Sequence, residues 1–191
     1  MRAWTIPKLF VGLSVVIFIV VFLVQGITEE ATRFNIRLSA RISFIFFCAA
    51  FAASSLQYSI KGPFTFWLLM NRKFIGVTFA IIHLIHLGLL FLLQVKFHPV
   101  FEFAATSSLL AGGGAYVFIV LMLVSSFDSV KNRMNTKTWK FTHTIGIYWI
   151  AVVFLSTYGK RVIDELEFLP LFILLVIGFL LRFAKFLKKR F

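Results

Sequence analysis

Three histidines are the residues of this 191-residue chain whose side chains could do chemistry in an otherwise apolar setting. His83 and His86 occur in the run FAIIHLIHLGLLFLL, three residues apart, so both imidazoles lie on one face of a helix. His143 follows the basic entrance TWKFTH of another apolar run. Histidine is a frequent metal ligand, and b-type haem is the usual cofactor of helical bundles. We weigh a haem site against the simpler alternative, in which each neutral imidazole is hydrogen-bonded to a carbonyl or hydroxyl group.

The composition places these histidines in an integral membrane protein. Hydrophobic residues make up 60% of the chain and charged residues only 14%. A soluble domain averages about 45–50% apolar and about 25% charged residues, so the apolar excess is too large for one buried core. The net charge of +13 comes from basic residues between apolar runs, which suits loops that face an anionic leaflet. We therefore expect a lipid bilayer as partner and no nucleic acid.

Six apolar segments are candidate transmembrane helices, because a spanning helix needs roughly 20 mostly apolar residues. They are residues 9–27, 42–56, 74–95, 104–127, 141–158 and 168–183. Isolated segments must cross as helices, since every backbone amide needs a partner within the segment. The sequence therefore predicts an all-α membrane protein, a six-transmembrane-helix bundle that forms a single domain over residues 1–191. Its only cysteine, Cys48, excludes an intrachain disulfide.

The distribution of Lys and Arg predicts the direction of the spans. Fourteen of the 20 basic residues lie in the N-terminal tail, the second and fourth predicted loops and the C-terminal tail. By the positive-inside rule, both termini are then cytoplasmic. The first span lacks a small-residue cleavage site after it, so we interpret it as a helix and not as a signal peptide. We expect a multi-pass protein of a bacterial inner (plasma) membrane.

The predicted depths of the histidines limit how they can share one iron. Counted from residue 74, His86 lies about 18 Å into the membrane and His83 about 14 Å. Counted from residue 141, His143 lies only about 3 Å deep. The two axial nitrogens of a bis-histidine haem lie about 4 Å apart, since each iron–nitrogen bond is near 2 Å. The offset between His86 and His143, roughly 15 Å, predicts that these two do not hold one haem together.

Two segments of the chain, NRKFIGVTFAIIHLIH and WKFTHTIGIYW, resemble the ferric-reductase-like transmembrane domain. They are most similar to its variant in the haem-binding membrane subunit of the bacterial periplasmic methionine-sulfoxide reductase system. That variant has a basic pair and a glycine ten residues before a third-span histidine, matched here by Arg72, Gly76 and His86. It also has Trp-Lys-x-x-His at the start of the fifth span, matched by Trp139 and His143. The resemblance covers residues 38–160 approximately and implies electron transfer through b-type haem.

The chain departs from the ligand pattern of this family at two positions. The family has a second fifth-span histidine thirteen residues after the first, and here that residue is Ser156. Two-haem members have a third-span histidine fourteen residues before the position of His86, and here that residue is Arg72. Each expected haem site thus keeps one of its two ligands. At one site His86 is kept and Ser156 stands at the other ligand position; at the second site His143 is kept and Arg72 stands at the other position. The resemblance implies one haem, at most two, or none, held by His86 alone or by His86 with His83 or a hydroxyl.

Two further features have competing interpretations. Arg72 is either an interfacial positive anchor or a contact for a haem propionate, a quinone or a phospholipid headgroup. The glycines of AGGGAY, residues 111–116, favour close helix packing in lipid. They are not a phosphate-binding loop, because they follow no strand.

Two function classes follow from the sequence. The first is a b-type haem transmembrane protein that passes electrons from a cytoplasmic flavoprotein or a quinol toward the outer side. The second is a haem-poor or haem-less structural or assembly subunit of a larger membrane complex. Neither a hydrolase or transferase residue set nor a glycine-rich nicotinamide or flavin fingerprint occurs, so electrons would have to come from a reductase partner or a quinone.

Overall fold

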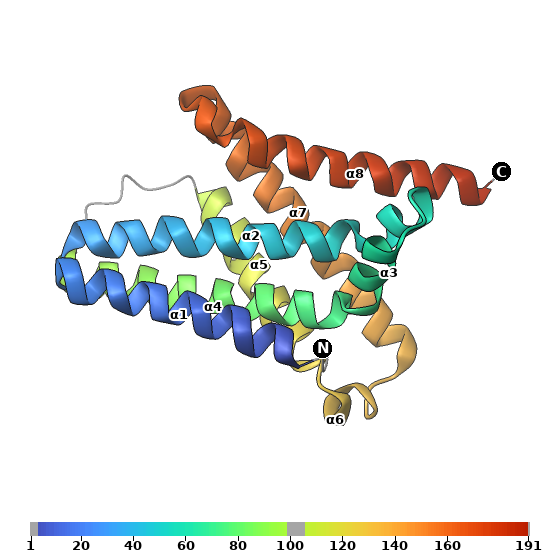
Figure 1. Ribbon diagram of the computed structural model, residues 1–191, viewed down its shortest axis with the longest axis horizontal. Helices are drawn as coiled ribbons and strands as arrows, with labels where there is room; N and C mark the ends of the chain where they lie inside the picture. The colour runs from blue at the N-terminus through green and yellow to red at the C-terminus, as the bar shows by residue number, and fades with distance from the viewer. Residues whose placement is uncertain (1–3, 99–105, 191) are drawn as a thin grey trace. The chain divides into compact units, whose positions relative to one another are not determined.

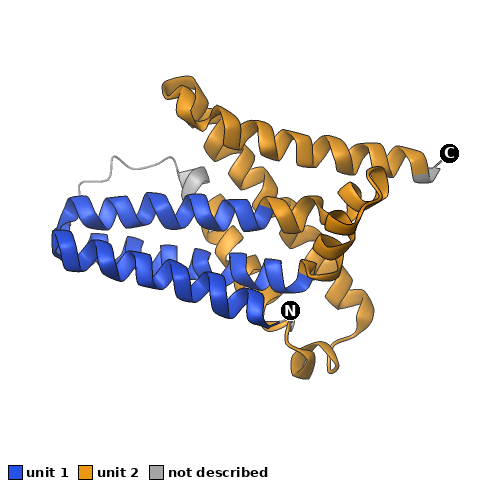
Figure 2. Ribbon diagram, in the orientation of Figure 1, with its two compact units in different colours: residues 1–47, 73–104 blue, residues 48–72, 105–191 orange. Residues whose placement is uncertain are grey.

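The computed structural model describes residues 4–98 and 106–190, and all secondary structure in these ranges is helical (Figure 1). The elements are α1 (Thr5–Gln25), α2 (Glu29–Ser59), α3 (Pro63–Met70), α4 (Arg72–Phe97), α5 (Thr106–Val124), α6 (Asp128–Lys131), α7 (Thr136–Asp164), the 3-10 helix η1 (Leu166–Phe168) and α8 (Leu169–Arg190). The chain forms two compact units (Figure 2). Unit 1 comprises Met1–Phe47 and Lys73–Ala104, and unit 2 comprises Cys48–Arg72 and Ala105–Phe191.

Five helices among the described residues are long and apolar enough to cross a membrane. They are α1, α2, α4, α7 and the run Leu166–Lys188 formed by η1 and α8. The predicted span 104–127 corresponds to α5, whose apolar stretch Leu110–Val124 is shorter, and residues 104 and 105 lie outside the described residues. The all-helical architecture of the described residues is thus confirmed, and the five long apolar helices are compatible with an integral multi-pass membrane protein. Six spans and cytoplasmic termini stay predictions.

Several helices extend well beyond the predicted apolar segments, because charged residues continue them. The helix α2 begins at Glu29, where acidic side chains suit the positive end of the helix dipole. Arg33 pairs with Glu29 one turn away at 2.7 Å. Arg33, Arg37 and Arg41 precede the predicted span 42–56, which left them in a loop between two spans; that placement is wrong, since all three are residues of α2. Likewise α7 begins five residues before the predicted span, where the Asn135 side chain caps it by accepting from the Lys137 amide at 2.8 Å.

Unit 1 packs α1, the first part of α2 and α4 alongside one another (Figure 1). The rings of Phe10 and Phe46 meet edge to face at 5.1 Å, while farther along α1 the Phe18 carbonyl accepts from Asn35 Nδ2 at 3.2 Å. These two contacts show that α1 and α2 are antiparallel. The rings of Phe47 and Phe79, 5.2 Å apart, join α2 to α4.

The face of α2 inside unit 1 is a polar stripe. Its members, spaced three or four residues apart, have no exposed surface: Thr32, Asn35, Ser39 and Ser43. The three hydroxyl groups each donate to a carbonyl three or four residues earlier in the chain, which satisfies them without water. Small polar residues at a helix interface let backbones approach closely in lipid. The polar stripe therefore brings α2 near the helices that carry the candidate chemistry.

Within unit 2, one glycine of the AGGGAY segment lies close against a neighbouring helix. A Cβ atom on Gly114 would lie 3.1 Å from the indole of Trp149, which belongs to α7. The same indole donates from Nε1 to the Ala111 carbonyl at 3.1 Å. The predicted packing role is therefore confirmed for Gly114, whereas Cβ atoms on Gly112 and Gly113 would meet nothing within 4 Å.

The last helix, α8, packs against the second half of α2 within unit 2. The rings of Phe51 and Phe179 lie 5.1 Å apart, and the Lys185 ammonium donates to the Ser54 carbonyl at 2.9 Å. Since both residue numbers increase together, α8 and this part of α2 run parallel. The contact places basic side chains of α8 beside aromatic side chains of α2.

The glycine contact yields a stability prediction. Replacement of Gly114 by Ala should lower the free energy of unfolding by about 1 kcal/mol, because the Trp149 indole must shift from its hydrogen bond. Gly113→Ala is the matched control and should cause no loss, since its Cβ is unobstructed. Thermal unfolding of the purified protein in detergent compares the two, and equal melting temperatures would contradict this packing role.

Candidate functional site

His83 and His86 lie on the face of α4 that packs against α2 within unit 1. Both side chains are half-buried, and their rings stack with centroids 5.1 Å apart and an interplanar angle of 25°. Phe79, one turn before, lies against His83 at 5.4 Å. The predicted sharing of one helix face is therefore confirmed, and that face meets the polar stripe of α2.

His86 is held in a defined protonation state by two acceptors of α2. Its Nδ1 lies 3.0 Å from the Ile36 carbonyl oxygen and 3.1 Å from Ser39 Oγ. A carbonyl only accepts, and Ser39 Oγ already donates to the same carbonyl at 2.9 Å, so Nδ1 of His86 must carry the hydrogen. In this neutral tautomer the in-plane lone pair is on Nε2. This hydrogen-bonded arrangement is the one that metal-ligating histidines adopt.

His83 bonds to a serine one turn farther along α2. Its Nδ1 lies 2.9 Å from Ser43 Oγ, which donates to the Ala40 carbonyl at 3.0 Å. Because the single hydroxyl hydrogen is used on that carbonyl, Ser43 accepts from the Nδ1–H of His83. The contact fits the simpler role of an interhelical hydrogen bond.

The stacked rings limit which residues could hold a haem. A nitrogen lone pair lies in the plane of its imidazole ring, so the lone pairs of two stacked rings point side by side and not at a common iron. His83 and His86 therefore cannot supply the two opposite axial ligands of one haem in this arrangement. A haem needs as few as one axial histidine, so this arrangement leaves room for at most one of the two as a ligand to a given haem. No group of three or more His, Cys, Asp or Glu that could hold a metal ion occurs within residues 4–98 and 106–190.

His143 occupies an equivalent hydrogen-bonded position in unit 2. Its Nε2 lies 2.9 Å from Ser125 Oγ, which donates to the Leu121 carbonyl at 2.6 Å. The Trp139 ring packs on the imidazole with centroids 4.3 Å apart, and its Nε1 donates to the Ser125 carbonyl at 3.0 Å. His143 and Trp139 thus both anchor the start of α7 to the end of α5.

The two residues that replace expected haem ligands lie in unit 2. Arg72 is half-buried, and its charge acts on the His143 imidazole of the same unit. Ser156 is exposed on α7, so its hydroxyl does not point into the core of its unit. The structure thus groups His83 with His86 in one unit and Arg72 with His143 in the other.

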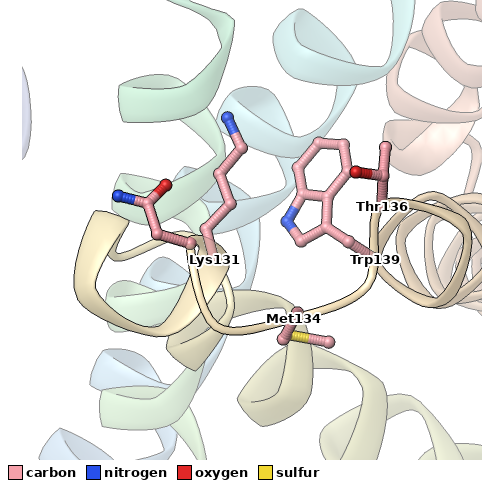
Figure 3. A pocket seen from close by; sticks show the side chains of 5 residues that line it. Lys131, Met134, Thr136 and Trp139 are labelled. Carbon is pink, nitrogen blue, oxygen red and sulfur yellow. The ribbon is translucent and has the colours of Figure 1, made fainter.

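A pocket of about 450 Å³ lies where α6 leads into α7, beside the His143 anchor (Figure 3). Its lining combines a cation, an indole and neutral polar groups: Lys131, Asn132, Met134, Thr136 and Trp139. The Lys131 ammonium lies 5.3 Å from the centre of the Trp139 ring. The sequence did not indicate this pocket, because the chain reversal at residues 132–135 creates it.

The serine partners were also missed from the sequence. Ser39 and Ser43 lie on either side of the start of the predicted span 42–56. They are one helical turn apart, and that spacing is a weak signal of a common face. What could not be seen is which helix this face meets. Ser125 has no comparable signal, since it follows a continuous apolar run.

No protein-family model matches the chain, and comparisons with curated proteins and with solved structures also found no match. The resemblance of the two histidine segments to the ferric-reductase-like domain therefore stays a prediction from the sequence.

The anchor at His143 can be tested with two adjacent serines. Ser125→Ala should lower the free energy of unfolding by about 1–3 kcal/mol, because it leaves the half-buried imidazole N–H without its acceptor. Ser126→Ala is the control, since the Ser126 hydroxyl donates only to the Met122 carbonyl of its own segment, at 2.6 Å. Thermal unfolding in detergent is the measurement, and equal loss in both variants would contradict the anchoring role.

Proposed function

We propose that the protein is a b-type haem transmembrane electron-transfer protein with His86 as the axial ligand. The observation that carries this proposal is the fixed Nδ1–H tautomer of His86, which directs the Nε2 lone pair away from its acceptors on α2. A bound haem would supply a reversible one-electron change at iron. The protein's own part is to orient one imidazole and to surround it with apolar side chains.

The Ile36 carbonyl and Ser39 would set the strength of the ligand. A hydrogen bond from Nδ1 to an acceptor raises the basicity of the opposite ring nitrogen and fixes the ring plane. Both acceptors lie on α2, where Ser39 belongs to the polar stripe and has no exposed surface. Water therefore does not compete for the bond at Ser39.

The wider arrangement proposed is six spans with cytoplasmic termini in a bacterial inner membrane. The excess of basic residues in the two tails and in alternate loops supports this orientation. Electrons would come from a cytoplasmic flavoprotein or a quinol, because the sequence contains no glycine-rich nucleotide fingerprint. They would leave toward an acceptor on the outer side.

A second candidate function is a haem-poor or haem-less subunit of a larger membrane complex. One observation favours it: His83 and His86 each bond to a serine of α2, and His143 bonds to Ser125, which directly follows α5. Imidazole–hydroxyl pairs of this kind hold transmembrane helices together without any cofactor. In this hypothesis Ser156 and Arg72 mark ligand positions that have been lost.

The visible spectrum of the purified full-length protein separates the two functions. Protein from haem-replete cells should show a Soret band and a pyridine haemochrome of b-type haem. His86→Ala should abolish the band, because it removes the proposed ligand, whereas His143→Ala and His83→Ala should retain it. A colourless wild-type preparation from such cells would overturn the haem proposal, and co-purification with a stable partner would then favour the subunit function.

The serines offer a finer test of ligand tuning. Ser39→Ala should keep the haem, because the Ile36 carbonyl still accepts from Nδ1, but should raise the midpoint potential by weakening the ligand. Ser43→Ala is the matched control one turn away, since Ser43 bonds to His83 instead. Redox titration followed by absorbance compares them. An equal potential shift in both variants would argue against His86 as the ligand that Ser39 tunes.

A further inference from the structure

An arginine of α8 lies in an aromatic cage within unit 2. The Arg182 guanidinium carbon is 4.3 Å from the centre of the Phe51 ring and 4.9 Å from that of Tyr148. Phe51 has no exposed surface, whereas Tyr148 is 41% exposed, so the cage opens at the Tyr148 side. Two rings hold the cation at a fixed place, and such contacts are stronger when the cation is desolvated.

The cage leaves part of the guanidinium unsatisfied. Nη1 of Arg182 is buried and has no hydrogen-bond partner among the described residues. The N–H groups of a guanidinium lie in its plane and need acceptors, which the faces of aromatic rings do not replace. Buried polar groups in proteins are nearly always paired, so this donor indicates an acceptor that the described residues do not supply.

A second cation adds to this demand. Arg72 is near enough for its charge to act on Arg182, and neither residue forms a salt bridge with a described acidic residue. Two guanidinium groups repel each other unless an anion lies between or beside them. Lys185, one turn after Arg182, is engaged with the Ser54 carbonyl.

The position of Arg182 along α8 indicates which anion. It stands just before the basic end KFLKKR, where a transmembrane helix reaches the headgroup level of its leaflet. Phosphate is the anion that every phospholipid presents at this level. Arginine also matches phosphate oxygens with two parallel N–H donors.

We infer that Arg182 and Arg72, with Arg182 held between Phe51 and Tyr148, form a binding site for a phosphate group. The site takes a phospholipid headgroup phosphate or a free phosphate ion, and it does not depend on the haem proposal. The aromatic rings orient one guanidinium, and the phosphate oxygens satisfy Nη1 and offset the repulsion between the two arginines.

The experiment uses the purified full-length protein, delipidated in a neutral detergent. Its melting temperature is followed during titration with phosphatidylglycerol, phosphatidylcholine or inorganic phosphate. Wild type should be stabilised by a ligand that carries phosphate, and the apparent affinity should fall at least tenfold in Arg182→Gln and in Arg72→Gln. Lys188→Gln is the matched control, because it removes the same charge from an exposed position of α8.

The three titrations, with phosphatidylglycerol, phosphatidylcholine and inorganic phosphate, identify the source of the phosphate. Stabilisation by both lipids but not by inorganic phosphate assigns a headgroup phosphate, and stabilisation by inorganic phosphate assigns a free anion. Arg182→Lys retains the charge but not the paired N–H donors, so its affinity for the phosphate ligand should also fall. If Arg182→Gln does not fold, Arg182→Lys and Arg72→Gln together test the inference. The inference is overturned if none of the three ligands stabilises wild type. It is also overturned if Lys188→Gln lowers the apparent affinity as much as the arginine variants do.

Discussion

Hydrogen bonding of imidazole between long apolar helices is the constraint on which this structure depends. A polar group that is packed among apolar side chains must find its partner within the protein. In this chain, His83 and His86 each find a serine of α2, and His143 finds Ser125 directly after α5, at 2.9–3.1 Å. Each bond joins two helices of the same unit, so it also fixes how one helix is rotated against the other. The polar stripe of α2 exists for the same reason, since its serines accept from one helix while they donate to their own.

The same constraint makes His86 different from the other two histidines. Its Nδ1 reaches the Ile36 backbone carbonyl as well as a hydroxyl, and only this additional acceptor defines the tautomer by itself. An imidazole whose proton is fixed on one nitrogen is prepared to donate from the other. His83 and His143, bonded to hydroxyl groups, retain the character of helix-to-helix contacts. The serine bonds fix the tautomers of His83 and His143 as well, so the additional backbone acceptor is the feature that makes His86 the candidate ligand.

In unit 2, the contacts between α8 and α2 involve charged side chains of α8 in place of neutral imidazoles. Arg182 is held by aromatic faces and Lys185 by a backbone carbonyl, and both contacts secure α8 against α2. A carbonyl satisfies the ammonium, whereas ring faces satisfy only the charge of the guanidinium. The proposed phosphate would complete what the rings leave open, because its oxygens accept from the guanidinium N–H groups.

The sequence by itself determined that the chain is helical, with helices apolar and long enough to cross a membrane, and that His83 and His86 share a helix face, because hydropathy and the period of a helix are local properties. Helix ends were less well predicted, since Glu29 and Arg33 stabilise the start of α2 although they are not apolar. Only the tertiary structure decided the partners of each histidine, because these depend on which face of α2 or α5 meets which helix. It also decided that His83 and His86 stack and so cannot oppose each other across one iron, a consequence of ring orientation that residue spacing does not contain.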